Sequence, residues 1–536
     1  MAGSGSARAN WILGLVFLSG AVALVLELSA VRLLAPWFGA TSAVWTHVIG
    51  VILLALSLGY LLGARLARSP QPLRALAVVL WLACASTAWL PALARPVAAW
   101  FVPAGLALDE AALLLRWGSL AASLLLFAPP TFVIGCVAPL ASEWLQRAQG
   151  ATAGEAGGRV LGLSTLGSLA GSFATTYWLI PELGLTRTYL GCALLLGALA
   201  LLAGVHARRF GAELAALLLL AGALAGSRWR RPEPDASTRV LEECETAYQS
   251  ARVVERSPPG EPTLRFLQVN EGFDSFQSVW QAQPGLLPEG YYYNAFALPA
   301  AWDAQQSGPW RTLVLGLGGG TTWRVLQGTL GTGRSLAGEG IEIDARLVEL
   351  ARRWMDLREA PGLCICAGID GRSALRNLPG GYDQIVVDAY ANQVEIPPQL
   401  ATLEFFREAA TRLRPGGWIS ANVGGFGLHD PVVEALARTA AAALDARVLV
   451  FAVPFSRNLA LIARRGAALP EPGSAAFRAL ADPGLARLAS QVSLPGTWRF
   501  VEPGAEPVLV DDHAPIERLQ ERSLELAAQA RAKAGS

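Results

Sequence analysis

Residues 312–320 read Thr-Leu-Val-Leu-Gly-Leu-Gly-Gly-Gly, a short apolar run that passes directly into a glycine-rich turn. The sequence from about Thr322 onward has a helical pattern, so this stretch predicts a buried strand, a tight turn and a helix. Further strands are predicted at 338–343, 363–367, 384–387, 418–423 and 447–453, with helical periodicity between most of them. Such alternation predicts a Rossmann-like α/β domain over residues 309–536, built on a parallel, doubly wound sheet.

Carboxylates follow the successive strands of this predicted sheet. Glu342, in Ile341-Glu-Ile-Asp344, ends the second strand, where a carboxylate accepts the hydroxyl protons of a nucleoside ribose. Asp370 follows the third strand and is expected to bind the exocyclic amine of an adenine, and Asp388 follows the fourth. The alternative is that Asp370 and Asp388 only cap helices. The predicted nucleotide-binding residues are Gly316, Gly318, Gly319, Gly320, Thr321, Glu342, Asp344, Asp370, Gly371 and Asp388.

The first 230 residues have a different character and are predicted to form a transmembrane helical domain. Hydrophobic residues make up 53% of the whole chain, which is more than an ordinary water-soluble enzyme contains. Six apolar stretches have about the length that a bilayer requires, and they lie at 11–30, 44–62, 73–90, 117–140, 160–180 and 188–205. A seventh candidate at 214–227 is shorter, so the chain is expected to have six or seven spans.

Basic residues predict how these spans are oriented. Arg65, Arg68 and Arg74 lie between the second and third spans, and Arg208 and Arg209 follow the sixth. The positive-inside rule places both loops in the cytoplasm. With six spans the α/β domain is then cytoplasmic, and the chain is expected to be a multi-pass protein of a bacterial-type inner membrane. The first span is read as retained rather than cleaved.

Other features of the chain limit its functions. The formal net charge is +1, from 43 basic and 42 acidic residues, so no nucleic-acid partner is expected. The six cysteines show neither a disulfide framework nor zinc-ligand spacing, so no metal is expected. Glu27, inside the first span, needs a partner such as Arg32 or His47, and it would serve either as an interhelical lock or as the lining of a cation path. Gly59 with Gly63, and Gly167 with Gly171, have the spacing for close helix contact.

From Arg239 onward, apolar and polar residues alternate in short, interrupted stretches. This pattern predicts a small antiparallel β lid over residues 239–300. Aromatic residues gather in this lid and just after the fourth strand, where they would either cage a cation or form the core of the lid. They are Phe273, Phe276, Trp280, Tyr291, Tyr292, Tyr293 and Tyr390. Tyr293 and Tyr390 are predicted to act with Asp388 in catalysis.

The order of these motifs resembles the spermidine synthase (polyamine aminopropyltransferase) family, in particular its membrane-fused branch. The resemblance rests on the glycine turn, Glu-Ile-Asp344, Asp370-Gly-Arg and Tyr382-Asp-Gln-Ile-Val-Val-Asp-Ala-Tyr390. Three further segments extend the resemblance over nearly the whole chain. They are Glu27-Leu-Ser-Ala-Val-Arg-Leu-Leu-Ala-Pro-Trp-Phe-Gly39, Gly59-Tyr-Leu-Leu-Gly-Ala-Arg65 and Asp511-Asp-His-Ala-Pro-Ile-Glu517.

The resemblance implies a transfer reaction in which an amine attacks the carbon beside the sulfonium of decarboxylated S-adenosylmethionine and releases methylthioadenosine. It implies that Asp388 orients and deprotonates the amine, while Glu342 holds the ribose and Asp370 the adenine. Three family carboxylates are missing, since Thr321, Ala391 and Ala295 stand in their places. Their absence argues against putrescine in the usual pose, and loss of the first also admits the carboxylate of intact S-adenosylmethionine as donor.

Two alternatives remain open at the level of sequence. One is an enzyme that methylates an acceptor with S-adenosylmethionine, or that cleaves this donor without an amine. The other is a carrier or receptor for polyamines or related cations, in which the α/β domain only senses nucleotide. A homodimer would supply the second half of such a carrier. The expected acceptor of the enzyme is a small amine or another small cation.

Overall fold

The computed structural model describes residues 3–39, 41–101, 108–207, 238–246, 248–258, 260–269, 278–330, 334–358, 362–390, 396–504 and 508–534. At residues 3–10, 108–116, 531, 532 and 534 it describes the backbone alone. The chain divides into two compact units, the first built mainly from residues 1–233 and the second mainly from residues 234–536. Each unit is described by itself.

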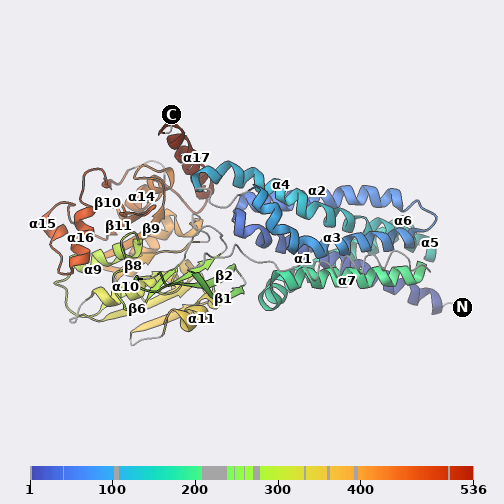
Figure 1. The fold of residues 1–536 in the computed structure, drawn as a ribbon, viewed down its shortest axis with the longest axis horizontal. Helices are drawn as coiled ribbons and strands as arrows, with labels where there is room; N and C mark the ends of the chain where they lie inside the picture. The colour runs from blue at the N-terminus through green and yellow to red at the C-terminus, as the bar shows by residue number, and fades with distance from the viewer. Residues whose placement is uncertain are drawn as a thin grey trace. The chain divides into compact units, whose positions relative to one another are not determined.

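The first unit is a bundle of long apolar helices (Figure 1). Its elements are α1 (Gly3–Phe38), α2 (Ser42–Leu66), α3 (Pro72–Phe101), α4 (Leu108–Gly135), α5 (Val137–Gln149), α6 (Ala153–Ala174), the π-helical η1 (Thr175–Leu183) and α7 (Gly184–Ala207). Within the bundle α1 packs against α6, α2 against α4, and α3 against α7.

Five continuous helical stretches of this unit are long and apolar enough to cross a membrane, at Trp11–Phe38, Ser42–Leu66, Pro72–Phe101, Trp117–Gln149 and Ala153–His206. The last has 54 residues, about 80 Å of helix, which exceeds the ~30 Å core of a bilayer. It contains both the fifth and the sixth predicted spans, joined through η1 and Gly184, whose φ is 74°. The fifth and sixth predicted spans thus lie on separate helices, α6 and α7, while the expected six or seven membrane crossings stay a prediction, and the candidate at 214–227 lies outside the described residues.

The predicted close contacts of glycines in the bundle are confirmed. A Cβ atom on Gly59 would lie 2.1 Å from the carbonyl oxygen of Phe132, and one on Gly167 would lie 1.9 Å from that of Phe17. These positions bring α2 against α4 and α1 against α6 at a distance that no side chain allows. Glu27, in contrast, makes no hydrogen bond or ion pair among the residues that the structure describes, and His47 Nδ1 lies 2.9 Å from Ser119 Oγ. Within the described part of the bundle, the predicted lock is therefore not seen.

We expect Gly59→Val to disrupt the bundle, because the new side chain would overlap the backbone of α4. Gly50→Val on the same helix is the matched control, since a Cβ there meets nothing within 4 Å. Thermal unfolding of the detergent-purified chain should show a midpoint several degrees lower for Gly59→Val only, in line with the cost of overpacking of about 1–3 kcal/mol. Equal midpoints for the two variants would contradict the close contact.

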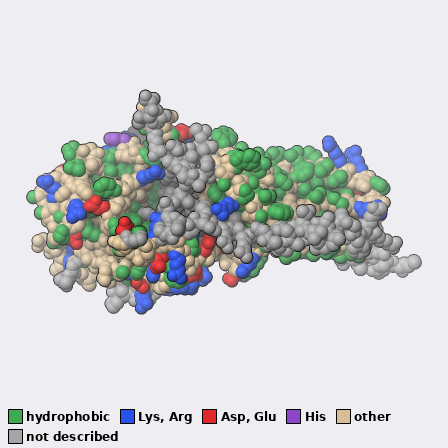
Figure 2. Space-filling view, in the orientation of Figure 1, with side chains coloured by type: hydrophobic (Ala, Val, Ile, Leu, Met, Phe, Trp, Pro, Cys, Tyr) green, Lys and Arg blue, Asp and Glu red, His purple; other side chains and the backbone are tan. Residues whose placement is uncertain are grey.

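The outer surface of the bundle is apolar. Large hydrophobic side chains are exposed along several helices, among them Leu61 (65% exposed), Leu161 (61%) and Leu54 (56%). Figure 2 shows hydrophobic side chains over much of the visible face of this unit. An exposed apolar surface of this extent is typical of helices that face lipid.

The second unit begins with a four-stranded sheet in the order β1-β2-β3-β4, in which β3 runs antiparallel to both β2 and β4. It lies in the segment predicted as a small β lid, and its role as a lid stays a prediction. Its strands are β1 (Thr238–Glu245), β2 (Ser250–Arg256), β3 (Leu264–Val269) and β4 (Ser278–Gln281). The end of the predicted lid segment is helical, with the 3₁₀-helix η2 (Tyr292–Ala297) and the short helix α9 (Leu298–Trp302).

The main sheet of the second unit has eight strands in the order β12-β10-β11-β9-β8-β5-β6-β7. They are β5 (Trp310–Leu315), β6 (Leu336–Glu342), β7 (Leu363–Ala367), β8 (Tyr382–Val387), β9 (Leu413–Gly424), β10 (Val448–Ala452), β11 (Asn458–Arg464) and β12 (Trp498–Val501). Between them lie α10 (Thr321–Thr329), α11 (Ala345–Trp354), α12 (Gly371–Asn377), the 3₁₀-helix η3 (Pro398–Leu400), α13 (Leu403–Arg412), α14 (Pro431–Leu444), α15 (Ala475–Arg478) and α16 (Pro483–Gln491), and α17 (Ile516–Ala534) follows.

The sheet is mixed, which corrects the prediction of a parallel one. Strands β7, β6, β5, β8 and β9 are parallel, but β11 runs antiparallel to both β9 and β10, and β12 antiparallel to β10. The short connection between β10 and β11 requires an antiparallel pair. The Rossmann part, β5 to β9, is as predicted.

The order of strands places a topological switch point beside β5. The chain winds from β5 outward to β6 and β7, then returns to add β8 on the opposite side of β5. Side chains such as Leu313, Leu315, Ile385 and Val387 bury both strands in the core. In open α/β sheets ligands bind where the carboxyl ends of two such strands diverge. The glycine turn and Asp388 lie at this point.

Candidate active site

The turn after β5 passes close to the backbone that follows β8. Gly316 has a φ of 88°, and a Cβ there would lie 2.4 Å from the carbonyl oxygen of Asp388. The amide of Asp388 in turn donates to the carbonyl of Leu315 at 2.9 Å. Only glycine combines this conformation with this approach. The turn and Asp388 are therefore held in one place.

Glu342 joins the end of β6 to the glycine turn. Its Oε2 accepts from the amide of Gly318 at 2.8 Å, and its Oε1 accepts from that of Asp344 at 3.0 Å. Burial raises the pKa of Glu342 to about 7, although these backbone donors oppose the shift. A carboxylate has about four acceptor positions, so these backbone donors do not use all of them and a ligand hydroxyl can still donate to Glu342.

Asp388 is held at both of its oxygens. Tyr292 donates its hydroxyl to Oδ2 at 3.2 Å, and the amide of Asn422 donates to Oδ1 at 3.1 Å. Asn458 donates in turn to the amide oxygen of Asn422 at 2.8 Å, which fixes its orientation. Burial raises the pKa of Asp388 to about 8, since neither partner carries a charge. A cation bound beside this carboxyl would restore its ionised form.

Two tyrosines of η2 connect Asp388 with the lid and the glycine turn. The rings of Tyr292 and Tyr293 stack with their centroids 4.1 Å apart. Tyr293 is fully buried, and its hydroxyl interacts with the side chains of Ser278 and Thr321. Ser278 Oγ also accepts from the amide of Gly319 at 2.7 Å. The predicted catalytic residue Tyr293 thus lies one residue away from the tyrosine that touches Asp388.

Thr321 makes two hydrogen bonds to the backbone of β4. Its hydroxyl donates to the carbonyl of Val279 and accepts from the amide of the same residue, each at 2.9 Å. The side chain is buried. β4 therefore occupies the donor position and one acceptor position of this hydroxyl, and direct donor binding by Thr321 stays a prediction.

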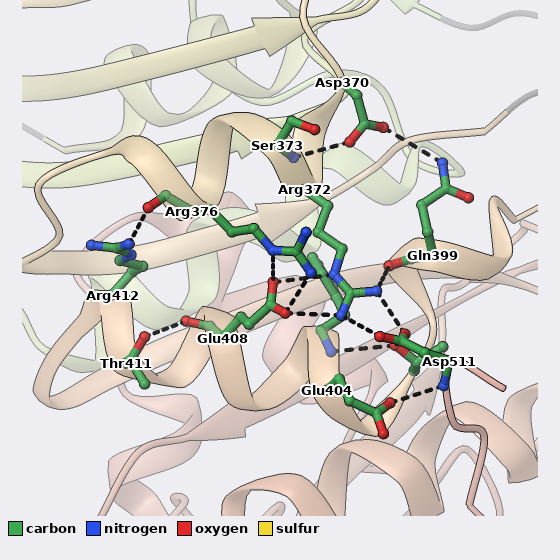
Figure 3. A network of polar contacts seen from close by, with 12 residues as sticks. Asp370, Arg372, Ser373, Arg376, Gln399, Glu404, Glu408, Thr411, Arg412 and Asp511 are labelled. Carbon is green, nitrogen blue, oxygen red and sulfur yellow. Dashed lines mark hydrogen bonds and ion pairs between the residues drawn. The ribbon is translucent and has the colours of Figure 1, made fainter.

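Asp344 and Asp370 each cap a helix. Asp344 accepts from the amide of Arg346 at 3.1 Å at the start of α11 and is itself buried. Asp370 accepts from the amide of Ser373 at 3.0 Å at the start of α12, and Gln399 donates to its other oxygen at 3.5 Å (Figure 3). Asp370 thus caps α12 and keeps room for a further donor on its exposed side, so its contact with an adenine stays a prediction. Gly371 follows as the first residue of α12.

Arg372 anchors α12 from its other side, as Figure 3 shows. Its guanidinium pairs with both oxygens of Asp511, at 2.6 and 2.8 Å, and with Glu408 at 2.9 Å. The Arg372 side chain is only 7% exposed, and hydrogen bonds from it hold the pKa of Glu408 at about 2. Two of the motifs recognised in the sequence, at 370–372 and 511–517, therefore meet in one ion-pair network.

Tyr390 is bound to the backbone of β9. Its hydroxyl donates to the carbonyl of Asn422 at 2.9 Å and accepts from the amide of Gly424 at 3.0 Å. The ring is therefore fixed next to Asp388, and a catalytic role for it stays a prediction. Trp280 lies under Arg265, whose guanidinium carbon is 4.4 Å from the ring centre. Phe273, Phe276 and Ala391 lie outside the described residues.

Curated relatives of the chain carry related names. A probable polyamine aminopropyl transferase of Bifidobacterium longum is 31% identical over 285 residues, which cover 48% of this chain and 61% of the relative. A polyamine aminopropyltransferase of Mycobacterium tuberculosis is 26% identical over 317 residues, covering 54% and 56%. The chain is spermidine synthase-like. It spans about three fifths of the length of these relatives, and no family model matches it.

Among solved structures, a probable spermidine synthase from Corynebacterium glutamicum aligns with 50% of this chain and 98% of its own length, at 22% identity and a TM-score of 0.38. The spermidine synthase-like resemblance inferred from the motifs is confirmed by the curated relatives. The site it led to was incomplete, since Tyr292, Asn422 and Ser278 were missed as partners of the acid and the turn. Asn422 alternates with core residues of β9 and could have been noticed as a polar residue in an apolar strand.

Proposed function

We propose that the chain is a membrane-embedded transferase of the aminopropyltransferase type. An amine nitrogen attacks the carbon beside the sulfonium of decarboxylated or intact S-adenosylmethionine. The carbon–sulfur bond breaks, its electron pair returns to sulfur, and methylthioadenosine leaves as a neutral thioether. The single observation that carries this proposal is Asp388, a carboxyl buried beside the glycine turn with no cation in contact among the described residues.

The chemistry of Asp388 suits the activation of an amine. A free alkylamine has a pKa of about 10.4, far above that of an ordinary carboxylate, so proton transfer between them is strongly uphill in water. The Asp388 carboxyl has a pKa of about 8, so its ionised form is a stronger base than an ordinary carboxylate. The gap between its pKa and that of the amine is therefore smaller, and proton transfer is less uphill. Asn422 and Tyr292 hold both oxygens in a fixed direction, which aligns the acceptor as an in-line displacement requires.

The donor is proposed to lie along the carboxyl ends of β5, β6 and β7. Glu342 would accept hydrogen bonds from the ribose hydroxyls at positions that the amides of Gly318 and Asp344 do not occupy. Asp370 would accept from the adenine amine. The sulfonium needs no protonation to leave, so the remaining task of the protein is to align carbon, sulfur and nitrogen. The bundle of α1–α7 is proposed to anchor the enzyme in the membrane.

The test is product analysis by mass spectrometry. The full chain in detergent is incubated with decarboxylated and, separately, intact S-adenosylmethionine, each with and without a series of small amines. Methylthioadenosine that appears only with an amine supports the proposal. S-Adenosylhomocysteine would instead identify a methyltransferase, and methylthioadenosine without any amine a donor-cleaving enzyme. Absence of both products with every donor would overturn the proposal.

Asp370 allows its two roles to be separated. Asp370→Ser retains a side-chain cap for α12 but removes the carboxylate, whereas Asp370→Ala removes both. We expect both variants to bind the donor at least about tenfold more weakly, a loss of about 1.4 kcal/mol, in calorimetric titrations of the full chain. Wild-type affinity in Asp370→Ser with loss only in Asp370→Ala would show that the residue supports the helix and does not touch the adenine.

A further inference from the structure

A groove opens on the helical unit between α2, α3 and the region where α4 passes into α5. It has a volume of about 620 Å³. Its walls are apolar, with Val78 and Leu82 from α3 and Phe132 and Val133 from α4. Val78 and Leu82 are each more than half exposed, so the groove continues into the open apolar surface of the bundle.

One end of this groove is polar and carries a positive charge. Gln71 and Arg74 line it where the chain turns from α2 into α3. The Arg74 guanidinium makes no hydrogen bond or ion pair within the described chain. Arg147, at the same end of the bundle, is by contrast fully engaged, since it binds Glu143 and the carbonyls of Ala67 and Ser69.

The position of Arg74 within α3 adds a second indication. Arg74 is the third residue of this 30-residue helix, and no acidic residue lies in the first turn. The helix dipole makes the first turn favourable for anions and unfavourable for cations. An unpaired arginine and a helix start without an acidic residue therefore both attract a negative group from outside the chain.

We propose that this groove binds an anionic glycerophospholipid, with its phosphate on Arg74 and one acyl chain along the apolar walls. Arginine pairs with phosphate oxygens through two parallel hydrogen bonds. An acyl chain that lies along Val78, Leu82 and Phe132 gains van der Waals contacts with these side chains. This inference rests on the proposed membrane location of the bundle.

Charge favours an anionic lipid over a zwitterionic one. The same turn carries Arg65 and Arg68, both exposed, so the local field is positive. A choline or ethanolamine group beside the phosphate would be repelled by these arginines. A small soluble anion such as glycerol phosphate would satisfy Arg74 but would leave the apolar walls uncovered.

The test uses native mass spectrometry of the full chain released from mixed micelles that contain equal amounts of phosphatidylglycerol and phosphatidylcholine. We expect phosphatidylglycerol to be retained at least about fivefold over phosphatidylcholine in the wild type. Arg74→Gln should reduce this preference to near one. Arg68→Gln is the matched control, because it removes a charge from the same turn without altering the groove, and it should keep most of the preference.

A second variant tests the apolar part of the site. Ala75→Trp places a large ring in the groove, and it should lower the retention of phosphatidylglycerol even though Arg74 is intact. Equal retention of both lipids by the wild type, or equal loss in Arg74→Gln and Arg68→Gln, would overturn the proposal. So would thermal stabilisation by glycerol phosphate as large as that by phosphatidylglycerol.

The failure of this inference can be told apart from that of the proposed function. Extraction of cell membranes with alkaline carbonate tests the membrane location alone. A chain that is released by carbonate removes the membrane part of the proposed function and this lipid site with it. A chain that stays with the membrane but shows no lipid preference removes only the lipid site, and product analysis with Asp388 intact is unaffected.

Discussion

Asp388→Asn should lower the rate of transfer by about 10² to 10⁴-fold, the range typical for loss of a general base. The amide has nearly the shape of the carboxyl and can still pair with Asn422 and Tyr292, so the site should keep its geometry. It cannot take a proton from an ammonium, and it has no negative charge to hold a cationic acceptor. Donor binding should change little, because the proposed donor contacts come from Glu342 and Asp370.

The same substitution should stabilise the ligand-free protein. The pKa of Asp388 is raised from 3.8 to about 8 in the folded state, so between these values the folded state binds one proton more than the unfolded state. Stability therefore falls as pH rises through this window, by at most about 1.4 kcal/mol per pH unit. Glu342, raised to about 7, contributes with the same sign. The change of Asp388 to asparagine would remove the larger part of this slope.

Hydrogen exchange followed by mass spectrometry is the suitable measurement, because it reports the second unit separately from the bundle. Peptides of β5 and β8 in Asp388→Asn should be more protected than in the wild type at pH 8 and similar at pH 5. Asp482→Asn is the control, since Asp482 caps α16 through the amide of Leu485 at 3.0 Å and asparagine caps equally well. Wild-type turnover in Asp388→Asn would remove Asp388 from the mechanism. Unchanged protection would show that burial of this carboxyl does not lower the stability of the fold.

Gly316→Ala should abolish donor binding, with a loss of more than about 100-fold, or about 2.7 kcal/mol. The new Cβ would lie 2.4 Å from the carbonyl oxygen of Asp388 and 2.7 Å from the Cα of Ala389. Neither neighbour is the flexible end of a side chain, so the turn and the segment after β8 must move apart. That movement would displace the turn from Glu342 and the acid from its partners together.

Gly308→Ala separates this contact from backbone strain. Gly308 has a φ of 91°, close to the 88° of Gly316, but a Cβ there meets nothing within 4 Å. Both variants carry the cost of a left-handed conformation, about 1–2 kcal/mol, and only Gly316→Ala carries the overlap. Calorimetric titration of the donor should show near wild-type affinity for Gly308→Ala. Similar losses in both variants would mean that strain, and not the contact with Asp388, governs the site.

The sequence was sufficient to predict the Rossmann part of the fold and the positions of its acids. Strand β5, the glycine turn and α10 follow from one continuous pattern, because a buried strand, glycines and a helical period are all local signals. Glu342, Asp370 and Asp388 could be placed because the ends of parallel strands meet at one edge of a sheet. The cap at Asp370 was one of the two readings of that residue, whereas the cap at Asp344 was not predicted.

Other features depend on contacts that no local pattern contains. Strand β11 inserts between β9 and β10, and a sequence does not reveal which strands become neighbours. Tyr292 and Tyr293 are identical neighbouring residues, so the sequence does not distinguish them. Only the packing of η2 decides which one touches Asp388. Thr321 looked available to a ligand, but β4 approaches from 42 residues earlier in the chain and takes its hydroxyl.

The pairing of Arg372 with Asp511 has a consequence for how the protein is made. The two residues lie 139 positions apart, and the arginine is almost buried, so its charge is only partly compensated until Asp511 has been synthesised. Helix α12, which presents Asp370, is thus supported by a segment that leaves the ribosome much later. A chain truncated before Asp511 should therefore hold α12, and with it Asp370, less firmly than a chain that contains this segment.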